Sequence, residues 1–199
     1  MVPSPVMGVA AVVLAAGEGT RFGGPGHKLL AELPGRPGVS VIDAAVAAVV
    51  ESRRRLAVDE IFVVWGAVAL HDRPWSHEVT LVHHDGWAAG QASSLLAGIG
   101  AADRGGHDVV VACPGDQPGV GPDAWCAVAT SAAAVGVASF ATGLRPPVRL
   151  ERSVWGLLPR WGDEGARAVM RSHPDLVVAV PVTGDPTDID TLEDLERWT

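Results

Sequence analysis

Residues Gly8 to Leu30 read GVAAVVLAAGEGTRFGGPGHKLL, and this stretch decides the fold. Its first part, Val9 to Ala16, is an unbroken apolar run rich in β-branched residues, which is typical of a strand buried on both faces of a parallel sheet. From Gly17 to His27 the chain carries five glycines and a proline, a density that neither a helix nor a strand tolerates. The stretch therefore predicts a buried strand that runs directly into a glycine loop.

This glycine loop carries the groups that phosphates require. Glycines let backbone N–H groups approach an anion closely, while Arg21 and Lys28 supply positive charge. Lys28 is the only lysine of the chain, and its compact ammonium suits a polyphosphate. The spacing is neither G-x-x-x-x-G-K-[ST] nor G-x-G-x-x-G, because Leu29 follows the lysine and Phe22 stands three residues after Gly19. A plain glycine-rich surface turn is the alternative interpretation.

Length and composition favour one globular domain. A chain of 199 residues with 48% hydrophobic and 19% charged residues is long and apolar enough for a full core, and we expect a single domain over residues 1–199.

The net charge of −8 argues against a nucleic-acid partner, which needs a basic face. No apolar run reaches the length of roughly 18 residues that a membrane span needs. No basic residue precedes the first apolar run, so a signal peptide is not indicated and we expect a cytoplasmic protein.

Apolar runs and helical patterns alternate along the rest of the chain. Strands are expected at 59–65, 78–83, 108–113, 135–140 and 176–180. Helices are expected at 41–52, 93–102 and 122–134, from about 161–167 to 172, and from about 191 onward. No element is predicted for 143–148, and a helical stretch is expected near 152–158. This alternation predicts an α/β fold, a three-layer Rossmann-like sandwich with a mostly parallel central sheet.

The segment after the expected strand 78–83 is a second candidate for ligand binding. Gly90 ends a loop, and Ser93 and Ser94 open a helix. Hydroxyls and free N–H groups at a helix start form a site for a ribose or a phosphate. A simple N-cap role for Ser93 is the alternative.

Acidic residues mark a third and a fourth segment. Asp116 comes just past the carboxyl end of a buried strand, where open α/β sheets place ligand and metal groups, although plain turn chemistry also explains an aspartate there. Mg²⁺ prefers one or two carboxylates together with phosphate oxygens and water. Asp188 and Asp190 precede a terminal helix whose Thr191 and Asp194 have capping-box spacing, so they are either ligands or a solvated cap.

Taken together, these motifs resemble the molybdenum cofactor cytidylyltransferase branch of the MobA-like nucleotidyltransferases. The opening signature L-A-A-G-x-G-T-R-F-G followed by K is filled by residues 14–23 and Lys28. The later motifs are G-W-A-A-G-Q-A-S-S-L at 86–95, D-Q-P at 116–118, G-D-E-G-A-R at 162–167 and D-I-D-T-L-E-D-L at 188–195. Related guanylyl-transferring enzymes tend to show L-A-G-G at the first motif, so L-A-A-G favours cytidine. The chain departs from the family at 143–147, which lacks the customary second glycine and histidine, and this leaves the acceptor open.

The resemblance implies the nucleotide-diphospho-sugar transferase fold and a Mg²⁺-dependent transfer of CMP from CTP to a phosphorylated acceptor, molybdopterin or molybdenum cofactor, with release of pyrophosphate. It implies Arg21, Lys28 and Asp116 as catalytic residues, and Asp116, Asp188 and Asp190 as metal ligands. The implied nucleotide-binding residues are Leu14, Ala15, Ala16, Gly17, Gly19, Thr20, Lys28, Gly90, Ser93 and Ser94. The implied acceptor-binding residues are Gly162, Asp163 and Arg167.

Two alternatives remain open on the sequence. The first is the same enzyme class with another acceptor, such as a sugar phosphate, and with GTP or another nucleoside triphosphate. The second is a nucleotide-binding delivery protein without turnover. The expected ligands are a nucleoside triphosphate and a small phosphorylated acceptor, and a molybdenum hydroxylase or its chaperone is the protein partner that a delivery role would involve.

Overall fold

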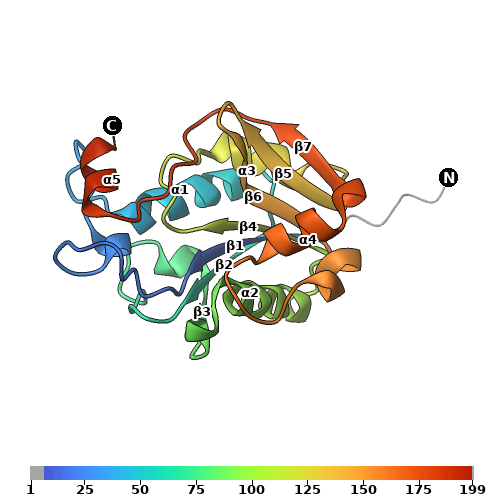
Figure 1. Ribbon diagram of the computed structural model, residues 1–199, viewed down its shortest axis with the longest axis horizontal. Helices are drawn as coiled ribbons and strands as arrows, with labels where there is room; N and C mark the ends of the chain where they lie inside the picture. The colour runs from blue at the N-terminus through green and yellow to red at the C-terminus, as the bar shows by residue number, and fades with distance from the viewer. Residues whose placement is uncertain (1–6, 199) are drawn as a thin grey trace.

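The central element is a seven-stranded sheet with the strand order β3-β2-β1-β4-β6-β5-β7 (Figure 1). The computed structural model describes residues 7–198. The strands are β1 Val9–Ala15, β2 Glu60–Trp65, β3 Thr80–His83, β4 Val109–Pro114, β5 Val135–Phe140, β6 Gly143–Glu151 and β7 Val177–Pro181. Strand β6 is antiparallel to both of its neighbours, β4 and β5, and every other pairing is parallel.

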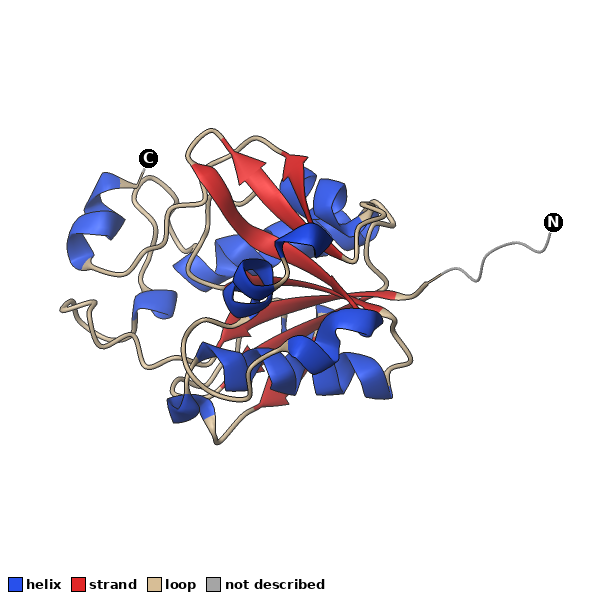
Figure 2. Cartoon of the chain, turned by 45° about the vertical axis from the view of Figure 1, so that its right-hand side comes forward, coloured by secondary structure: helices blue, strands red, loops and turns tan. Residues whose placement is uncertain are grey.

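Helices cover both faces of the sheet, so the predicted three-layer sandwich is confirmed (Figure 2). The helices are α1 Val41–Arg54, α2 Gln91–Arg104, α3 Pro122–Ala129, α4 Ala166–Ser172 and α5 Leu192–Arg197. Short 3-10 helices lie at Lys28–Leu30, Ser76–Glu78, Trp87–Ala89, Arg152–Leu157 and Pro174–Leu176. Helices α1 and α3 pack on one face of the sheet and α2 and α4 on the other, while α5 lies beyond the carboxyl ends of the strands and adds Leu195 to the core on the α1 side. Within residues 7–198, no helix has the length and apolar character needed to cross a membrane.

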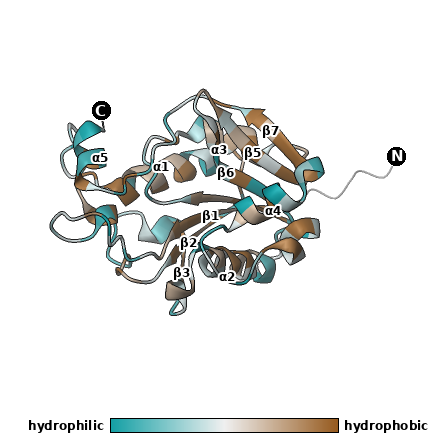
Figure 3. Cartoon of the chain, in the orientation of Figure 1, coloured by the Kyte–Doolittle hydropathy of each residue, from teal (hydrophilic) through white to brown (hydrophobic). Residues whose placement is uncertain are grey.

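Strand β1 is the centre of this arrangement. Successive side chains alternate between the two cores, with Ala11 and Val13 facing α1 and Ala10 and Val12 facing α2, and all four are at most 1% exposed. Strands β1, β2 and β7 appear largely brown in Figure 3. Because β1 pairs in parallel with both β2 and β4, the glycine loop after β1 and the acidic turn after β4 leave the sheet side by side.

Strand β6 is the main element that the sequence pattern did not predict. Proline is depleted in paired strands because it donates no ladder hydrogen bond, so Pro146 and Pro147 make a strand at this position unusual. The register between β5 and β6 shifts at Val137 and Ala138, which pair with Val148 and Arg145. The two prolines therefore lie in a bulge, where the ladder needs no donor from them.

The expected helix 122–134 is shorter, because α3 ends at Ala129. The Ala133 carbonyl accepts a hydrogen bond from Arg149 Nε at 2.8 Å, and the Ala134 carbonyl accepts one from Glu151 N at 2.9 Å. The carbonyls of residues 133 and 134 are therefore used as hydrogen-bond acceptors for β6, and these residues do not continue the helix.

We expect alanine to have opposite effects at two glycines of α2. A Cβ at Gly98 would lie 2.5 Å from Val12 Cγ1, whereas a Cβ at Gly100 meets only the end of the Arg104 side chain at 3.5 Å. Gly98→Ala should lower the free energy of unfolding by about 1–3 kcal/mol through overpacking. Gly100→Ala should raise it by about 0.5–1 kcal/mol, because alanine favours the helix. Urea denaturation measures both variants, and equal effects would contradict this packing of α2 on β1.

Candidate functional site

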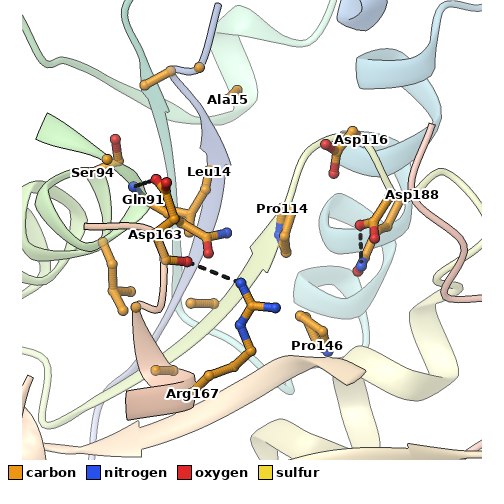
Figure 4. Close-up of a pocket in the computed structure, with 18 of the residues that line it drawn as sticks. Leu14, Ala15, Gln91, Ser94, Pro114, Asp116, Pro146, Asp163, Arg167 and Asp188 are labelled. Carbon is orange, nitrogen blue, oxygen red and sulfur yellow. Dashed lines mark hydrogen bonds between the residues drawn. The ribbon is translucent and has the colours of Figure 1, made fainter. Parts of the chain in front are cut away.

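A cavity of about 860 Å³ lies at the carboxyl ends of β1 and β4 (Figure 4). Its walls come from the glycine loop, the start of α2, the turn after β4, strand β6 and helix α4. It brings together most of the residues that the sequence singled out: Leu14, Ala15, Ala16, Gly17, Gly19, Thr20, Arg21, Lys28, Gly90, Ser94, Asp116, Asp163, Arg167, Asp188 and Asp190. Ser93 and Gly162 do not line it.

The Lys28 ammonium lies between two carboxylates at one end of this cavity. Its Nζ is 2.5 Å from Asp116 Oδ2 and 2.7 Å from Asp190 Oδ1. The three side chains are only 12%, 17% and 25% exposed, respectively. Arg21, which is 75% exposed, approaches the other oxygen of Asp190 at 3.0 Å. Residues 28, 116 and 190, far apart in the sequence, thus form one charged cluster.

Burial and charge act against each other on these groups. Burial alone would lower the pKa of Lys28, but the charges and hydrogen bonds of Asp116 and Asp190 raise it, so the ammonium stays protonated. Burial, together with the negative charge of Asp116, raises the pKa of Asp188. The amide of Gln117 donates a hydrogen bond to Asp188 Oδ1 at 2.7 Å and partly offsets this effect.

The three predicted metal ligands are close together, but each has at least one oxygen engaged by another group of the protein. Lys28 Nζ donates hydrogen bonds to Asp116 Oδ2 and Asp190 Oδ1, and the side-chain amide of Gln117 donates one to Asp188 Oδ1. No set of three or more His, Cys, Asp or Glu side chains in the described part of the chain is arranged to hold a metal ion. The Oδ1 atom of Asp116 is buried and has no hydrogen-bond partner among residues 7–198.

Backbone hydrogen bonds place the C-terminal acids beside the other two segments. Ile189 N donates to the Asp116 carbonyl at 2.9 Å, and Leu192 N donates to the Phe22 carbonyl at 3.0 Å. The predicted capping box at residues 191–194 is confirmed and fixes the start of α5. Asp190 is thereby held between the glycine loop and the turn after β4.

His27 is a positioning residue that the sequence pattern did not reveal. Its Nε2 is 2.9 Å from the Gly17 carbonyl, and its Nδ1 accepts a hydrogen bond from Leu29 N at 3.2 Å. Burial, opposed by the hydrogen bond to Gly17 and reinforced by the charge of Lys28, lowers the pKa of His27. The neutral ring therefore closes the glycine loop and fixes the backbone on both sides of Lys28. Nothing in the spacing of the motif distinguishes this histidine from an ordinary loop residue.

The start of α2 differs from the expectation of free N–H groups. Gln91 N donates to Asp163 Oδ1 at 3.3 Å, and Ala92 N donates to the Gly162 carbonyl at 2.9 Å. Gly90 has a φ of +100°, and a Cβ there would lie 2.6 Å from the Gly162 carbonyl carbon. These first amides therefore attach the 162–163 loop to α2 and are not open to a ligand.

The two serines of α2 have different surroundings. Ser93 Oγ donates to the Gly90 carbonyl at 2.8 Å and lies 3.0 Å from His84 Nε2, so it is neither an N-cap nor part of the cavity wall. Ser94 lines the cavity and is 5% exposed. Gln91, for which the sequence suggested no role, also lines the cavity, and its side-chain amide has no hydrogen bond to any described residue. Ser94 and Gln91 are therefore the polar side chains that α2 offers to a ligand.

The wall opposite the glycine loop combines apolar side chains with two arginines. Leu144, Val148 and Met170 line it together with Arg145 and Arg167. The two guanidinium groups donate to backbone carbonyls, at 3.1 Å for Arg145 and 3.0 Å for Arg167. Neither forms an ion pair within the described residues. The contribution of β6 to this wall could not be predicted, because β6 itself was not.

Comparison with known proteins places this site in a family. The model of the MobA-like NTP transferase domain matches residues 11–177. Comparison with curated proteins gave no significant match.

Three solved structures illustrate the structural likeness. A nucleotidyl transferase from Methanothermobacter thermautotrophicus is 28% identical over 96% of this chain and 95% of its own, with a TM-score of 0.74. Rv0371c from Mycobacterium tuberculosis, in complex with manganese, is 26% identical over 96% of this chain and 97% of its own, with a TM-score of 0.71.

A CMP:2-keto-3-deoxy-manno-octonic acid synthetase complexed with CTP is 13% identical over 96% of both chains, with a TM-score of 0.64. At that identity the likeness concerns the fold alone, and it confirms the predicted nucleotide-diphospho-sugar transferase fold. The match over residues 11–177 covers most of the chain, and this chain therefore belongs to the MobA-like NTP transferase family.

Proposed function

We propose that this protein transfers CMP from CTP to a phosphorylated acceptor, with release of pyrophosphate, and that the acceptor is molybdopterin in the free or molybdenum-bound form. The observation that carries the proposal is the charged cluster of Lys28, Asp116 and Asp190 in the cavity that the glycine loop borders. A nucleotidyl transfer needs cations that bind the phosphates and carboxylates that can hold a divalent cation beside one reaction centre.

The size of the cavity supports two ligands in one site. Its volume of about 860 Å³ lies near the upper end of the range for small-molecule sites, roughly 300–1,000 Å³. The wall near Ala15 and Ser94 and the wall near Pro146 and Arg167 face each other across the carboxyl ends of β1 and β4 (Figure 4). We assign the first wall to the nucleotide and the second to the acceptor.

Small and neutral groups border the nucleotide side. Leu14 and Ala15 leave space beside β1, and the free amide of Gln91 offers both a donor and an acceptor. Such an amide suits the mixed donor and acceptor edge of cytosine. The L-A-A-G motif at residues 14–17, where related guanylyl-transferring enzymes tend to show L-A-G-G, supports a cytidine nucleotide.

The carboxylates fit a divalent cation such as Mg²⁺. Asp116, Asp188 and Asp190 provide the hard oxygen ligands that Mg²⁺ and Mn²⁺ prefer, and Asp116 Oδ1 is a buried oxygen without a partner among residues 7–198. The manganese in the Mycobacterium tuberculosis relative supports this assignment. A cation held here would neutralise charge on the reacting phosphates.

The residues of the chain act mainly by positioning and by electrostatics. A phosphate oxygen of the acceptor attacks the α-phosphorus of CTP, the bond from that phosphorus to the bridging oxygen of the β-phosphate breaks, and pyrophosphate leaves. Lys28 and Arg21, with the amides of residues 17–23, stabilise the charge that develops on the departing pyrophosphate. Arg167 and Arg145 orient the anionic end of the acceptor, and the apolar side chains beside them exclude water.

A sugar phosphate is the second candidate acceptor, and the β6 wall is the observation that favours it. Arg145 and Pro146 occupy the segment that departs from the family motif, and both line the acceptor side of the cavity. A different acceptor would leave the nucleotide side of the cavity unchanged.

The proposal predicts CTP-dependent release of pyrophosphate. We expect the purified protein with Mg²⁺ and molybdopterin to release pyrophosphate from CTP at least about tenfold faster than from GTP, ATP or UTP, a preference of roughly 1.4 kcal/mol in transition-state binding. A coupled pyrophosphate assay with mass spectrometry of the product measures this. Faster turnover with a sugar phosphate would favour the second candidate, whereas CTP binding without any turnover would indicate a delivery protein.

Removal of one carboxylate tests the catalytic role of the cluster. Asp116→Asn should lower kcat by about 10²–10³-fold, since one preorganised electrostatic contact is lost. The matched control is Asp72→Asn, because the side chain of Asp72 is 93% exposed and lies outside the cavity. A folded Asp116→Asn protein with the wild-type kcat would refute the assignment.

A further inference from the structure

At least one oxygen of each carboxylate that would hold a divalent cation is engaged by a cationic or amide group of the same chain. Lys28 Nζ contacts one oxygen of Asp116 and one of Asp190, and Arg21 contacts the second oxygen of Asp190. The side-chain amide of Gln117 donates a hydrogen bond to Asp188 Oδ1. The ammonium is thus the group that lies where the two best-placed carboxylates converge.

From this geometry we propose that Lys28 is a stand-in for the divalent cation. In the free protein its ammonium holds the metal-binding carboxylates closed, and the triphosphate draws it away, so that metal and nucleotide bind cooperatively. This inference rests on the carboxylate site assigned above, but it does not depend on the identity of the acceptor or on turnover.

Like charge is the reason that the two cations exclude each other. A divalent ion on Asp116 Oδ2 and Asp190 Oδ1 would have to take the oxygens that the ammonium approaches at 2.5 and 2.7 Å. The Lys28 side chain is 12% exposed, so little solvent is present to screen the repulsion. A divalent ion can enter only when the ammonium leaves the space between the carboxylates.

The glycine loop offers the ammonium a second position. The Lys28 stem runs beneath this loop, because a Cβ at Gly19 would lie 3.2 Å from Lys28 Cγ. An unbranched side chain on that stem reaches either the carboxylates or a phosphate bound by the loop through rotation about its own bonds. A bound triphosphate would therefore supply the negative charge that Lys28 loses when it releases Asp116 and Asp190.

This exchange makes the effects of the two ligands on each other's affinity reciprocal. If the triphosphate raises the affinity for the metal by displacing Lys28, the metal raises the affinity for the triphosphate by the same factor. Without nucleotide, the metal must compete with an ammonium that is part of the chain. Removal of that ammonium should therefore strengthen metal binding in the free protein, although the same substitution harms phosphate binding.

The test measures Mn²⁺ affinity without nucleotide or acceptor, from the electron paramagnetic resonance signal of free Mn²⁺. We expect Lys28→Met to bind Mn²⁺ more tightly than the wild type, by about 5–150-fold, the usual range of coupling between sites. Lys28→Arg, which keeps a cation, should bind Mn²⁺ no more tightly than the wild type. Asp190→Asn in the Lys28→Met background should remove the gain. An equal or weaker affinity of Lys28→Met would overturn the proposal.

A stability measurement protects the test against misfolding. With its carboxylates unpaired, Lys28→Met should gain a larger rise in Tm from Mn²⁺ than the wild type does, because a ligand that binds only the native state stabilises it. If Lys28→Met does not fold in either condition, Lys28→Gln replaces it and the same two outcomes decide. Pyrophosphate release from CTP is assayed separately, so a failure of the proposed reaction and a failure of the cation exchange give different results.

Discussion

The contact of one buried ammonium with two carboxylates organises the functional end of this molecule. Lys28, Asp116 and Asp190 come from three segments that share no local structure, and none of the three charges would be stable at this depth alone. The three segments are held by different means. His27 closes the loop after β1, the second segment is the turn after β4, and residues 189–192 donate backbone hydrogen bonds to both of them. The cluster therefore exists only when the sheet and the C-terminal segment are both in place.

The sheet topology explains why these segments meet. Parallel pairing of β1 with β2 and β4 places the carboxyl ends of the three strands at one edge, which is where open α/β sheets bind ligands. The antiparallel strand β6 then runs back beside β4 and closes the opposite wall. If β6 were parallel to β4, it would need a crossover connection. Its first residues, 143–148, would then lie at the other end of β4, away from the cavity.

The sequence predicted the parts of the fold that depend on local patterns. Buried parallel strands are continuous apolar runs, so β1, β2, β4 and β5 were recognised within one residue at either end. Strand β6 depends on a bulge that accommodates two prolines, and such a bulge has no local signature. The same limit applies to the end of α3, where two carbonyls are taken by β6.

The sequence likewise predicted only part of the candidate site. Motif position was enough to bring Lys28, Asp116 and Asp190 into one cavity, because each follows a strand or precedes a capped helix. It could not tell Ser94 from Ser93, since that depends on the hydrogen bond of Ser93 to His84. Nor could it indicate that the first amides of α2 are taken by residues 162–163, which lie far away in the sequence.

The charge balance of the cavity bears on how an anion enters a protein with a net charge of −8. On the glycine-loop side of the cavity, Arg21 and Lys28 stand against Glu18, Asp116, Asp188 and Asp190, so carboxylates outnumber cations. The two cations are already paired with those acids, and a bare triphosphate would gain little from them and would meet uncompensated negative charge. Under the proposed cation exchange, a triphosphate that arrives with a divalent cation would reverse this balance, because the cation would satisfy the carboxylates while the released ammonium would satisfy the phosphates. Under the proposed exchange, the net acidity of the site would therefore favour the metal-bound nucleotide over the free one.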